Sequence, residues 1–435
     1  MRRYLLASLA IGGGASLLAL SLHWTGVFSG GAVWLGEFYH SRGLSSGVEW
    51  VKVFWLEILV TLLASLGTAW AVIEVTRLPR KIGAGVGALL VVLLLSPTLS
   101  LHGILLNPAA PFLATIAAFA GALVYSRSSL GRRKWLLEEA LGDRVSSKVF
   151  KRMLEAPSEP DFGGNVCEVT ILVCCHFPGE SSGPVASPGD VMKMGSLFQR
   201  AVSTFLLSRG AYLDESGPER VRATFGLTGE STDHAVDASR AALDLKLRLS
   251  GLAEEFESRW FHVPRFGVGI ETAQVTAGLC GIPGRFFLAT LGGGESFAGR
   301  LALANARFGS QVLAGPNVYQ RVRGTFELRP MEMVYDSERQ VLHETYELLA
   351  PTGSDDEVQK TRREEFWKGV ILLRQKSYEG ALEAFSKARI PGVDDAPLAY
   401  FTALAQDQVA LPESRPRRLV RELTEDGHAR SMNRF

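Results

Sequence analysis

Long apolar stretches dominate the first third of the chain. Four of them, residues 4–22, 53–73, 82–99 and 109–125, have about the length that a helix needs to cross a bilayer. The pattern predicts an α-helical membrane domain with four transmembrane helices over residues 1–126. A cleaved signal peptide is the alternative for the first stretch, although no convincing small-residue cleavage site follows it.

The hydrophobic period changes after residue 126. Residues 127–160 read as an amphipathic signalling helix or linker, because apolar side chains recur there at helical spacing. Alternating segments then predict strands at 167–173, 220–225, 265–271, 275–277 and 311–314, and helical periods predict helices at 191–207, 234–252 and 296–308. With a final hairpin that ends at 349, this order predicts one α+β domain over residues 161–350.

A helical pattern follows the α+β domain. Residues 351–410 contain a helical pair with the spacing of a tetratricopeptide repeat, followed by an extended helix over 397–409. One such unit cannot bury its own apolar face, so we expect it to pack on the α+β domain or on a protein partner. Residues 411–435 are rich in charge and are expected to form a mobile tail. The spacing is carried by Gly369, Tyr378, Ala381, Phe385 and Ala388.

Charge is distributed unevenly along the 435 residues. The chain has 46 Lys and Arg against 45 Asp and Glu, yet residues 1–126 hold only eleven charged side chains. This asymmetry excludes a single soluble globule, and the ordinary globular composition of the remainder excludes a transporter that fills the chain. Near-zero net charge argues against nucleic-acid binding. The four cysteines make a poor disulfide framework and are expected to be reduced thiols.

The cations indicate the orientation of the membrane domain. They precede the first apolar stretch, separate the second from the third and follow the fourth, whereas the two other loops hold only Arg42 and Lys52. We therefore expect an integral protein of a bacterial inner membrane with both termini and the α+β domain in the cytoplasm. The outward loop, residues 25–49, is too short for an independent sensory domain. Glu57 is expected to face lipid headgroups rather than to act in a proton relay.

Six segments carry a family resemblance over residues 139–350. They are LGDRVSSKVFKRMLE, EVTILVCCHF, RGAYLDESGPERVRATFG, STDHAVDASRAALDLKLRL, RFGVGIETAQVTAGLCG and LATLGGGESFAGRLALANARFGSQVLAGPNVYQRV. In this order they resemble the catalytic domain of class III adenylate/guanylate cyclases. The resemblance implies a ferredoxin-like α+β fold and head-to-tail pairing of two such domains. It also implies cyclisation of a nucleoside triphosphate by two divalent metals that two aspartates hold.

The metal positions of the family are altered in this sequence. The first metal-binding Asp falls on Cys175 and the second on Glu219, with the family's spacing of 44 residues. A neutral thiol is a poor ligand for Mg²⁺, which prefers oxygen. Glu219 keeps a carboxylate but is one methylene longer and follows Pro218 instead of the usual Gly. Metal binding at these positions is therefore doubtful.

The nucleotide positions are altered as well. The base-selecting Lys falls on Glu215, and its partner falls on Ala289, which offers no hydrogen bond. The ribose-orienting Asn falls on Ser296, while the Arg that stabilises the transition state is kept as Arg300. Residues 334–337 offer no cation where the family has a phosphate-binding Lys.

Simpler interpretations exist for these residues. Arg300 could be a solvated or interface arginine, and Glu215 and Glu219 could be ordinary turn carboxylates. A soft-metal site at residues 174–176 is disfavoured, because only Cys174 and His176 would share a strand face and two ligands do not make a zinc site. The glycines at 292–294 lack the Lys-Ser/Thr of a Walker motif.

Three functional hypotheses remain open from the sequence. The first is a catalytically degenerate pseudo-cyclase without a cofactor, which signals through dimerisation or partner binding. The second is an active nucleotidyl cyclase, a phosphorus–oxygen lyase that uses Mg²⁺ or Mn²⁺ to convert ATP or GTP. The third is a partner subunit whose Arg300 completes the site of a different cyclase. Expected partners are a second copy or a related cyclase, a protein on the helical tail, and membrane lipid.

Overall fold

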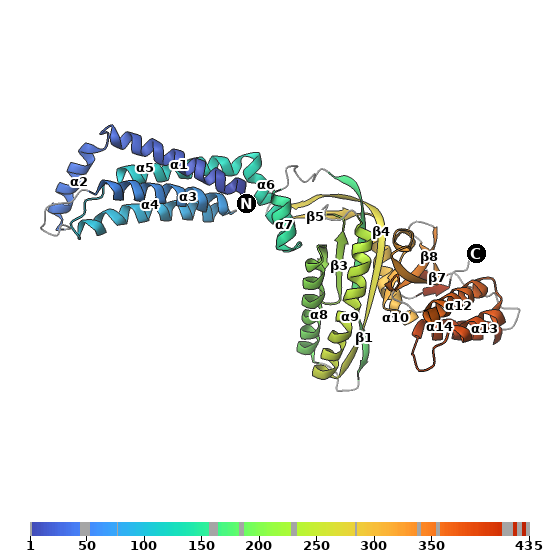
Figure 1. Ribbon diagram of the computed structural model, residues 1–435. Coiled ribbons are helices and arrows are strands. Elements are labelled where there is room, and N and C mark those ends of the chain that lie inside the picture. The colour runs from blue at the N-terminus through green and yellow to red at the C-terminus, as the bar shows by residue number, and fades with distance from the viewer. Residues whose placement is uncertain are drawn as a thin grey trace. The chain divides into compact units, whose positions relative to one another are not determined.

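The computed structural model describes most of the chain and groups it into two compact units. The described residues are 2–43, 53–75, 77–155, 164–181, 187–227, 233–282, 285–336, 341–353, 357–410, 421–423 and 429–431. One unit comprises residues 1–140 and 151–159, and the other comprises residues 141–150 and 160–435. Each unit is described by itself below, with the labels of Figure 1.

The first unit contains the four predicted membrane helices. They are α1 (Arg2–Trp24), α3 (Phe54–Glu74), α4 (Leu78–Ser100) and α5 (Ala109–Arg127). Each of the four is long and apolar enough to cross a membrane, which confirms the expected membrane domain. Small residues allow close contacts within the bundle, since a Cβ on Gly12 would lie 2.8 Å from the Cα of Leu66.

The connection between α1 and α3 differs from the expected loop. It contains helix α2 (Ser29–Ser41), whereas residues 44–52 lie outside the described residues. Glu57 turns inward, and its side chain is only 13% exposed. Its Oε2 lies 3.0 Å from His23 Nε2, and its Oε1 accepts a hydrogen bond of 3.1 Å from the Asn107 backbone N–H. Partners from the ends of neighbouring helices thus satisfy this carboxylate.

Two helices, α6 (Ser129–Leu141) and α7 (Ser147–Glu155), follow the membrane helices, as the amphipathic pattern predicts. The turn between them belongs to the second unit and is fixed by Arg144. The Arg144 carbonyl accepts a hydrogen bond of 2.8 Å from the Leu213 N–H, and its guanidinium lies 5.3 Å from the Phe287 ring centre. Residues 156–163 lie outside the described residues.

The second unit is built around one mixed sheet. Its spatial order is β10-β9-β7-β8-β6-β4-β1-β3-β2, with β5 paired to β4. The pairs β4–β6 and β7–β9 are parallel, and the other pairs are antiparallel. The strands are β1 (Asn165–Ser181), β2 (Tyr212–Ser216), β3 (Arg220–Phe225), β4 (His262–Ile282), β5 (Arg285–Leu291), β6 (Val312–Ala314), β7 (Phe326–Asp336), β8 (Val341–Pro351), β9 (Arg421–Leu423) and β10 (Ala429–Ser431).

Strands β9 and β10 lie in the region expected to be a mobile tail. Backbone pairing of Val334 with Arg421 adds them to the sheet beside β7, so that expectation is wrong for residues 421–423 and 429–431. The rest of residues 411–435 lies outside the described residues. Strand β4 is also continuous where two shorter strands were expected, because β1 pairs with it along most of its length.

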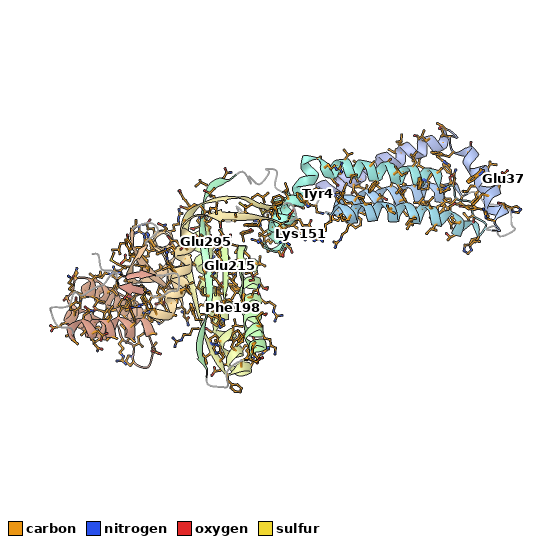
Figure 2. The ribbon with its side chains drawn as sticks, turned by 180° about the vertical axis from the view of Figure 1, so that it is seen from behind. Tyr4, Glu37, Lys151, Phe198, Glu215 and Glu295 are labelled. Carbon is orange, nitrogen blue, oxygen red and sulfur yellow. The ribbon has the colours of Figure 1, made fainter. Side chains whose placement is uncertain are left out.

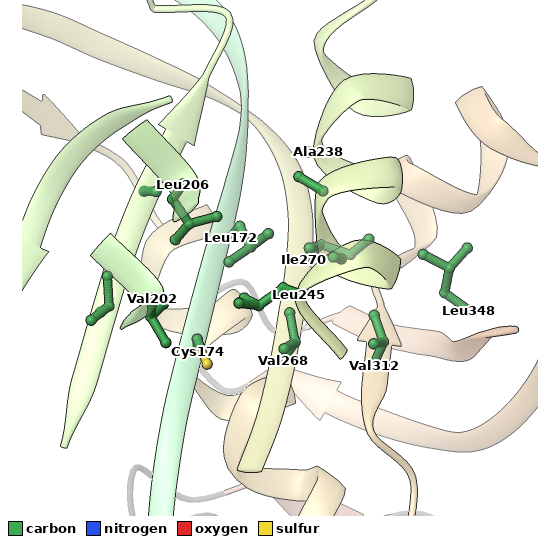
Figure 3. Close-up of a cluster of buried hydrophobic side chains, with 14 of the residues drawn as sticks. Leu172, Cys174, Val202, Leu206, Ala238, Leu245, Val268, Ile270, Val312 and Leu348 are labelled. Carbon is green, nitrogen blue, oxygen red and sulfur yellow. The ribbon is translucent and has the colours of Figure 1, made fainter. Parts of the chain in front are cut away.

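Helices cover both faces of the sheet. Helices α8 (Pro188–Ser208) and α9 (His234–Trp260) pack on one face, where Leu172 and Cys174 join a large apolar core (Figure 3). The alternate residues of β1, Ile171, Val173 and Cys175, face helix α10 (Gly294–Phe308) on the other side. A short helix that the sequence did not predict, α11 (Pro316–Val322), follows β6.

The helical tail packs on the α+β domain. Its helices are α12 (Glu357–Arg374), α13 (Tyr378–Ala388) and α14 (Ala396–Ala410). Their apolar faces share one core with the outer side of α10 and with β7. Of the two expected packing partners, the α+β domain and another protein, the α+β domain is the one that covers these faces. The larger side chains of this shared core are Phe297, Phe308, Met331, Phe366, Phe385 and Phe401.

Candidate functional site

Three of the residues that the sequence analysis singled out, Cys175, Glu215 and Glu219, lie at one end of the β1–β3–β2 part of the sheet. Cys175 on β1 pairs directly with Arg220 on β3, and Val173 pairs with Arg222. Because side chains alternate along a strand, both arginines lie on the same face as Cys175, opposite α8 and α9. Glu215 on β2 pairs with Arg222 just after a bulge. We call Cys175, Glu215, Glu219, Arg220, Arg222 and Glu295 the candidate site.

Charges within the candidate site neutralise one another. The Nε and Nη2 atoms of Arg220 donate to the two carboxylate oxygens of Glu215, each at 3.1 Å. Arg222 lies 3.7 Å from Glu215 and also pairs with Glu295 at the start of α10. Figure 2 labels Glu215 and Glu295, which lie close together. The carboxylate at the base-selecting position is thus held by two arginines of its own chain.

Cys175 has the properties of a structural thiol. It is 3% exposed, and burial raises its pKa to about 12, with Arg220 opposing and Glu215 adding to that shift. A thiol with this pKa stays protonated at neutral pH, and the protonated form is neither a good nucleophile nor a good metal ligand. The side chain therefore lacks the oxygen ligand that Mg²⁺ prefers.

Glu219 lies beside Cys175 and is exposed. Its backbone carbonyl accepts a hydrogen bond of 2.8 Å from the His176 N–H, which holds the turn before β3 against β1. Within the described ranges, no group of three or more His, Cys, Asp or Glu side chains could hold a metal ion. Of the two positions, only Glu219 offers the oxygen ligand that Mg²⁺ and Mn²⁺ prefer.

Cys174 and His176 pack in the apolar core on the opposite face of the sheet, under α8 and α9. Cys174 is fully buried there, and the His176 ring lies between 5.6 and 5.7 Å from the ring centres of Phe198, Phe256 and Phe266. Burial lowers the pKa of His176 to about 4, so its imidazole is neutral at pH 7. Both residues have the environment of packed core side chains.

The remaining sequence-predicted residues lie on β5 and α10. Ala289 pairs with Gly278 of β4, and Ser296 is half-buried in the first turn of α10. Arg300 is 5% exposed, and its guanidinium lies 5.9 Å from the centre of the Phe297 ring. Its own chain thus covers the retained arginine. Ser337, the last of the residues compared with the phosphate-binding Lys, lies outside the described residues.

Sequence reasoning missed four residues of this region. They are Asp214, Arg220, Arg222 and Glu295. The alternation in the segment RVRATF places both arginines on one face and could have revealed them. Asp214 accepts hydrogen bonds from Thr224 and, at 3.1 Å, from Thr290, and burial raises the pKa of its carboxyl group. No sequence signal links Asp214 to Thr290, which is 76 residues away.

Comparisons with known proteins return solved structures only. No protein-family model and no curated protein matches the sequence. The adenylyl cyclase CyaB from P. aeruginosa matches with 15% identity over 44% of this chain and 99% of its own, at a TM-score of 0.39. The guanylyl cyclase Cya2 matches with 15% identity over 44% of this chain and 97% of its own, at a TM-score of 0.37.

A third solved structure is the guanylate cyclase domain of RhGC from Catenaria anguillulae. It matches with 18% identity over 42% of this chain and 97% of its own, at a TM-score of 0.36. These three solved structures are named as an adenylyl cyclase, a guanylyl cyclase and a guanylate cyclase domain, and each matches at low identity over less than half of this chain.

Proposed function

We propose that this chain is a membrane-anchored class III nucleotide-cyclase homologue that no longer carries out the reaction and acts through association with other proteins. It would lie in a bacterial inner membrane with both termini and the α+β domain in the cytoplasm. The six sequence segments support the family, and the four apolar helices with their flanking cations support the membrane arrangement.

The observation that supports loss of catalysis most strongly is the charge pairing in the candidate site. Cyclisation requires carboxylates that are free to hold two metal ions and a cation that recognises the base. Here the base-selecting position holds Glu215, a carboxylate that Arg220 engages at 3.1 Å. One of the two metal positions holds Cys175, a buried and protonated thiol. Losing even one charge-stabilising group typically lowers the rate by about 10²–10³-fold. Several such losses together would leave no measurable turnover.

We expect the full-length protein in detergent to form no cyclic product from ATP or GTP with either Mg²⁺ or Mn²⁺. Product analysis by mass spectrometry checks this expectation, with a known cyclase as the positive control. Robust turnover that disappears in Glu219→Ala but persists in Glu254→Ala would contradict the proposal. Glu254 is the matched control because it is an exposed glutamate on α9, outside the candidate site.

Dimer formation is the second part of the proposal. Three large apolar side chains along the β4–β5 hairpin stay exposed in the single chain: Ile282 at 65%, Phe287 at 37% and Leu291 at 66%. Membrane anchoring raises the local concentration of a second chain, so even a weak interface would be occupied. The partner would be a second copy or a related cyclase.

Charged substitutions on this hairpin should weaken the dimer. We expect Ile282→Glu combined with Leu291→Glu to lower crosslinked dimer in native membranes by about tenfold, because each change removes apolar contact area. Val409→Glu is the control, since Val409 is 47% exposed on the distant helix α14. Unchanged crosslinking in the double variant would exclude this hairpin as the interface.

The retained arginine favours a second candidate function. Arg300 could complete the site of a different cyclase, as in heterodimeric members of the family that this sequence resembles. Because Arg300 is 5% exposed, the side chain would first have to leave the Phe297 ring. Activity of a co-purified cyclase that falls in Arg300→Ala, with complex formation unchanged, would favour this function over a purely non-catalytic one.

A further inference from the structure

A basic cavity lies within the membrane unit, where α3 and α5 end and α4 and α6 begin. Its volume is about 470 Å³, and all of its lining residues belong to the first unit. This is the end of the bundle that the flanking cations assign to the cytoplasmic side. Figure 2 labels one lining residue, Tyr4. The side chains that matter here are Tyr4, Arg77, Lys81, Tyr125, Lys134 and Trp135.

One of the cations around this basic cavity is already neutralised. The Nζ atom of Lys134 lies 2.9 Å from Glu74 Oε1 and donates to the Glu74 carbonyl at 3.1 Å. It also lies 5.8 Å from the centre of the Tyr4 ring. Glu74 thus compensates Lys134, whereas no carboxylate in the part of the chain that the structure describes forms an ion pair with Lys81 or Arg77.

Lys81 is the unusual member of the cavity lining. It is only 9% exposed, yet no carboxylate among the described residues forms an ion pair with it. Lys81 thus lines the cavity without a counter-charge from the described residues, and an anion in the cavity would supply one. A lysine that simply extends towards the membrane surface would be far more exposed. Arg77, exposed at the start of α4, supplies a second cation.

The position of the cavity indicates the kind of anion. Lys81 lies in the first turn of a membrane helix, near the level of lipid phosphate groups. Tyr4, Tyr125 and Trp135 are the amphipathic aromatic side chains that favour this level. Basic cavities between membrane helices on the cytoplasmic side are suited to anionic headgroups.

We propose that the basic cavity binds the phosphate group of an anionic phospholipid from the inner leaflet, with Lys81 and Arg77 as its cationic contacts. Lys134 and Trp135 lie on α6, the helix that leads along the chain to the α+β domain, so an occupied cavity would restrain α6. This site uses neither the candidate site nor the dimer, and its assignment to the inner leaflet rests on the membrane orientation of the proposed function.

Lipid retention by the full-length protein tests the proposal. The protein is incubated with vesicles of equal parts phosphatidylglycerol and phosphatidylcholine, extracted in mild detergent and analysed for bound lipid by native mass spectrometry. We expect phosphatidylglycerol to be enriched, and Lys81→Gln to lower the enrichment about fivefold, as expected for one cation near the membrane surface. Lys81→Arg should retain it. Arg80→Gln is the matched control, because Arg80 is exposed and adjacent but does not line the cavity.

Arg77→Gln provides a second measurement if Lys81→Gln does not fold, since Arg77 is exposed. It should also reduce enrichment by about fivefold. The proposal is overturned if Arg77→Gln and Lys81→Gln both keep the original ratio, or if Arg80→Gln loses as much as they do. Displacement of the lipid by glycerol phosphate at an equal concentration would show a site for free phosphates instead.

Discussion

Replacing Arg329 with alanine should lower the free energy of unfolding of the α+β domain by about 3–5 kcal/mol, because two acidic side chains would lose their shared cation. Arg329 on β7 is 9% exposed. Its Nη1 and Nη2 atoms donate to the two carboxylate oxygens of Asp395 at 2.7 and 2.9 Å, and its Nε donates to Glu347 at 2.7 Å. Glu347 is 5% exposed and would stay buried without a counter-charge.

Thiol exposure measures this loss in the full-length protein. Cys174 and Cys175 are buried in the α+β domain, so they react with a thiol reagent only when the domain unfolds in denaturant. Lys387→Ala removes an exposed ion pair on α13 and should shift the transition far less. A transition in Arg329→Ala that coincides with that of the control would contradict the expected role of this arginine.

Gly269→Ala should strongly destabilise the α+β domain, although it adds only one methyl group. A Cβ at this position of β4 would lie 2.2 Å from the Ala298 carbonyl oxygen and 2.4 Å from the Ala302 amide nitrogen. Both obstacles are backbone atoms of α10, so the helix would have to move away from the sheet. We expect a loss of about 3 kcal/mol, or failure to fold.

Gly299→Ala, on helix α10 itself, should have the opposite effect on stability. Nothing lies within 4 Å of a Cβ built at Gly299, and its position in the interior of α10 favours alanine. The substitution should stabilise the domain by about 0.5–1 kcal/mol. The denaturant midpoints of the two variants, read from the same thiols, should therefore move in opposite directions. A shared direction would mean that α10 does not pack on the β4 backbone as described.

Local patterns were sufficient to predict most elements of this fold. Strand β3 was predicted with its observed bounds, because RVRATF alternates cleanly between the two faces. The break expected at residues 272–274 was wrong, because β4 runs through Glu271 and Thr272 without interruption. Both are buried, and Glu271 accepts a hydrogen bond of 3.0 Å from Asn317. A partner 46 residues away leaves no local signal.

The sequence was sufficient to predict some positions of the candidate site, but not which side chains surround them. The resemblance located Cys175 and Glu219, and β1 and the turn before β3 bring them together. The pairing of Glu215 with Arg220 depends on the bulge in β2, and the burial of Arg300 depends on the Phe297 ring. These are tertiary features, and a motif comparison carries no information about them.

Because α10 and β7 share a core with the tail helices, the α+β domain can be grafted onto another protein only together with the tail. A graft that ends at Pro351 would transfer Phe308 and Met331 without the helices that cover them. Their apolar surface would then meet water, at about 25 cal/mol for each Å² uncovered. Chimeras that move this domain to another membrane anchor should therefore carry residues 141–431 as one piece, so that β9 and β10 stay with the sheet.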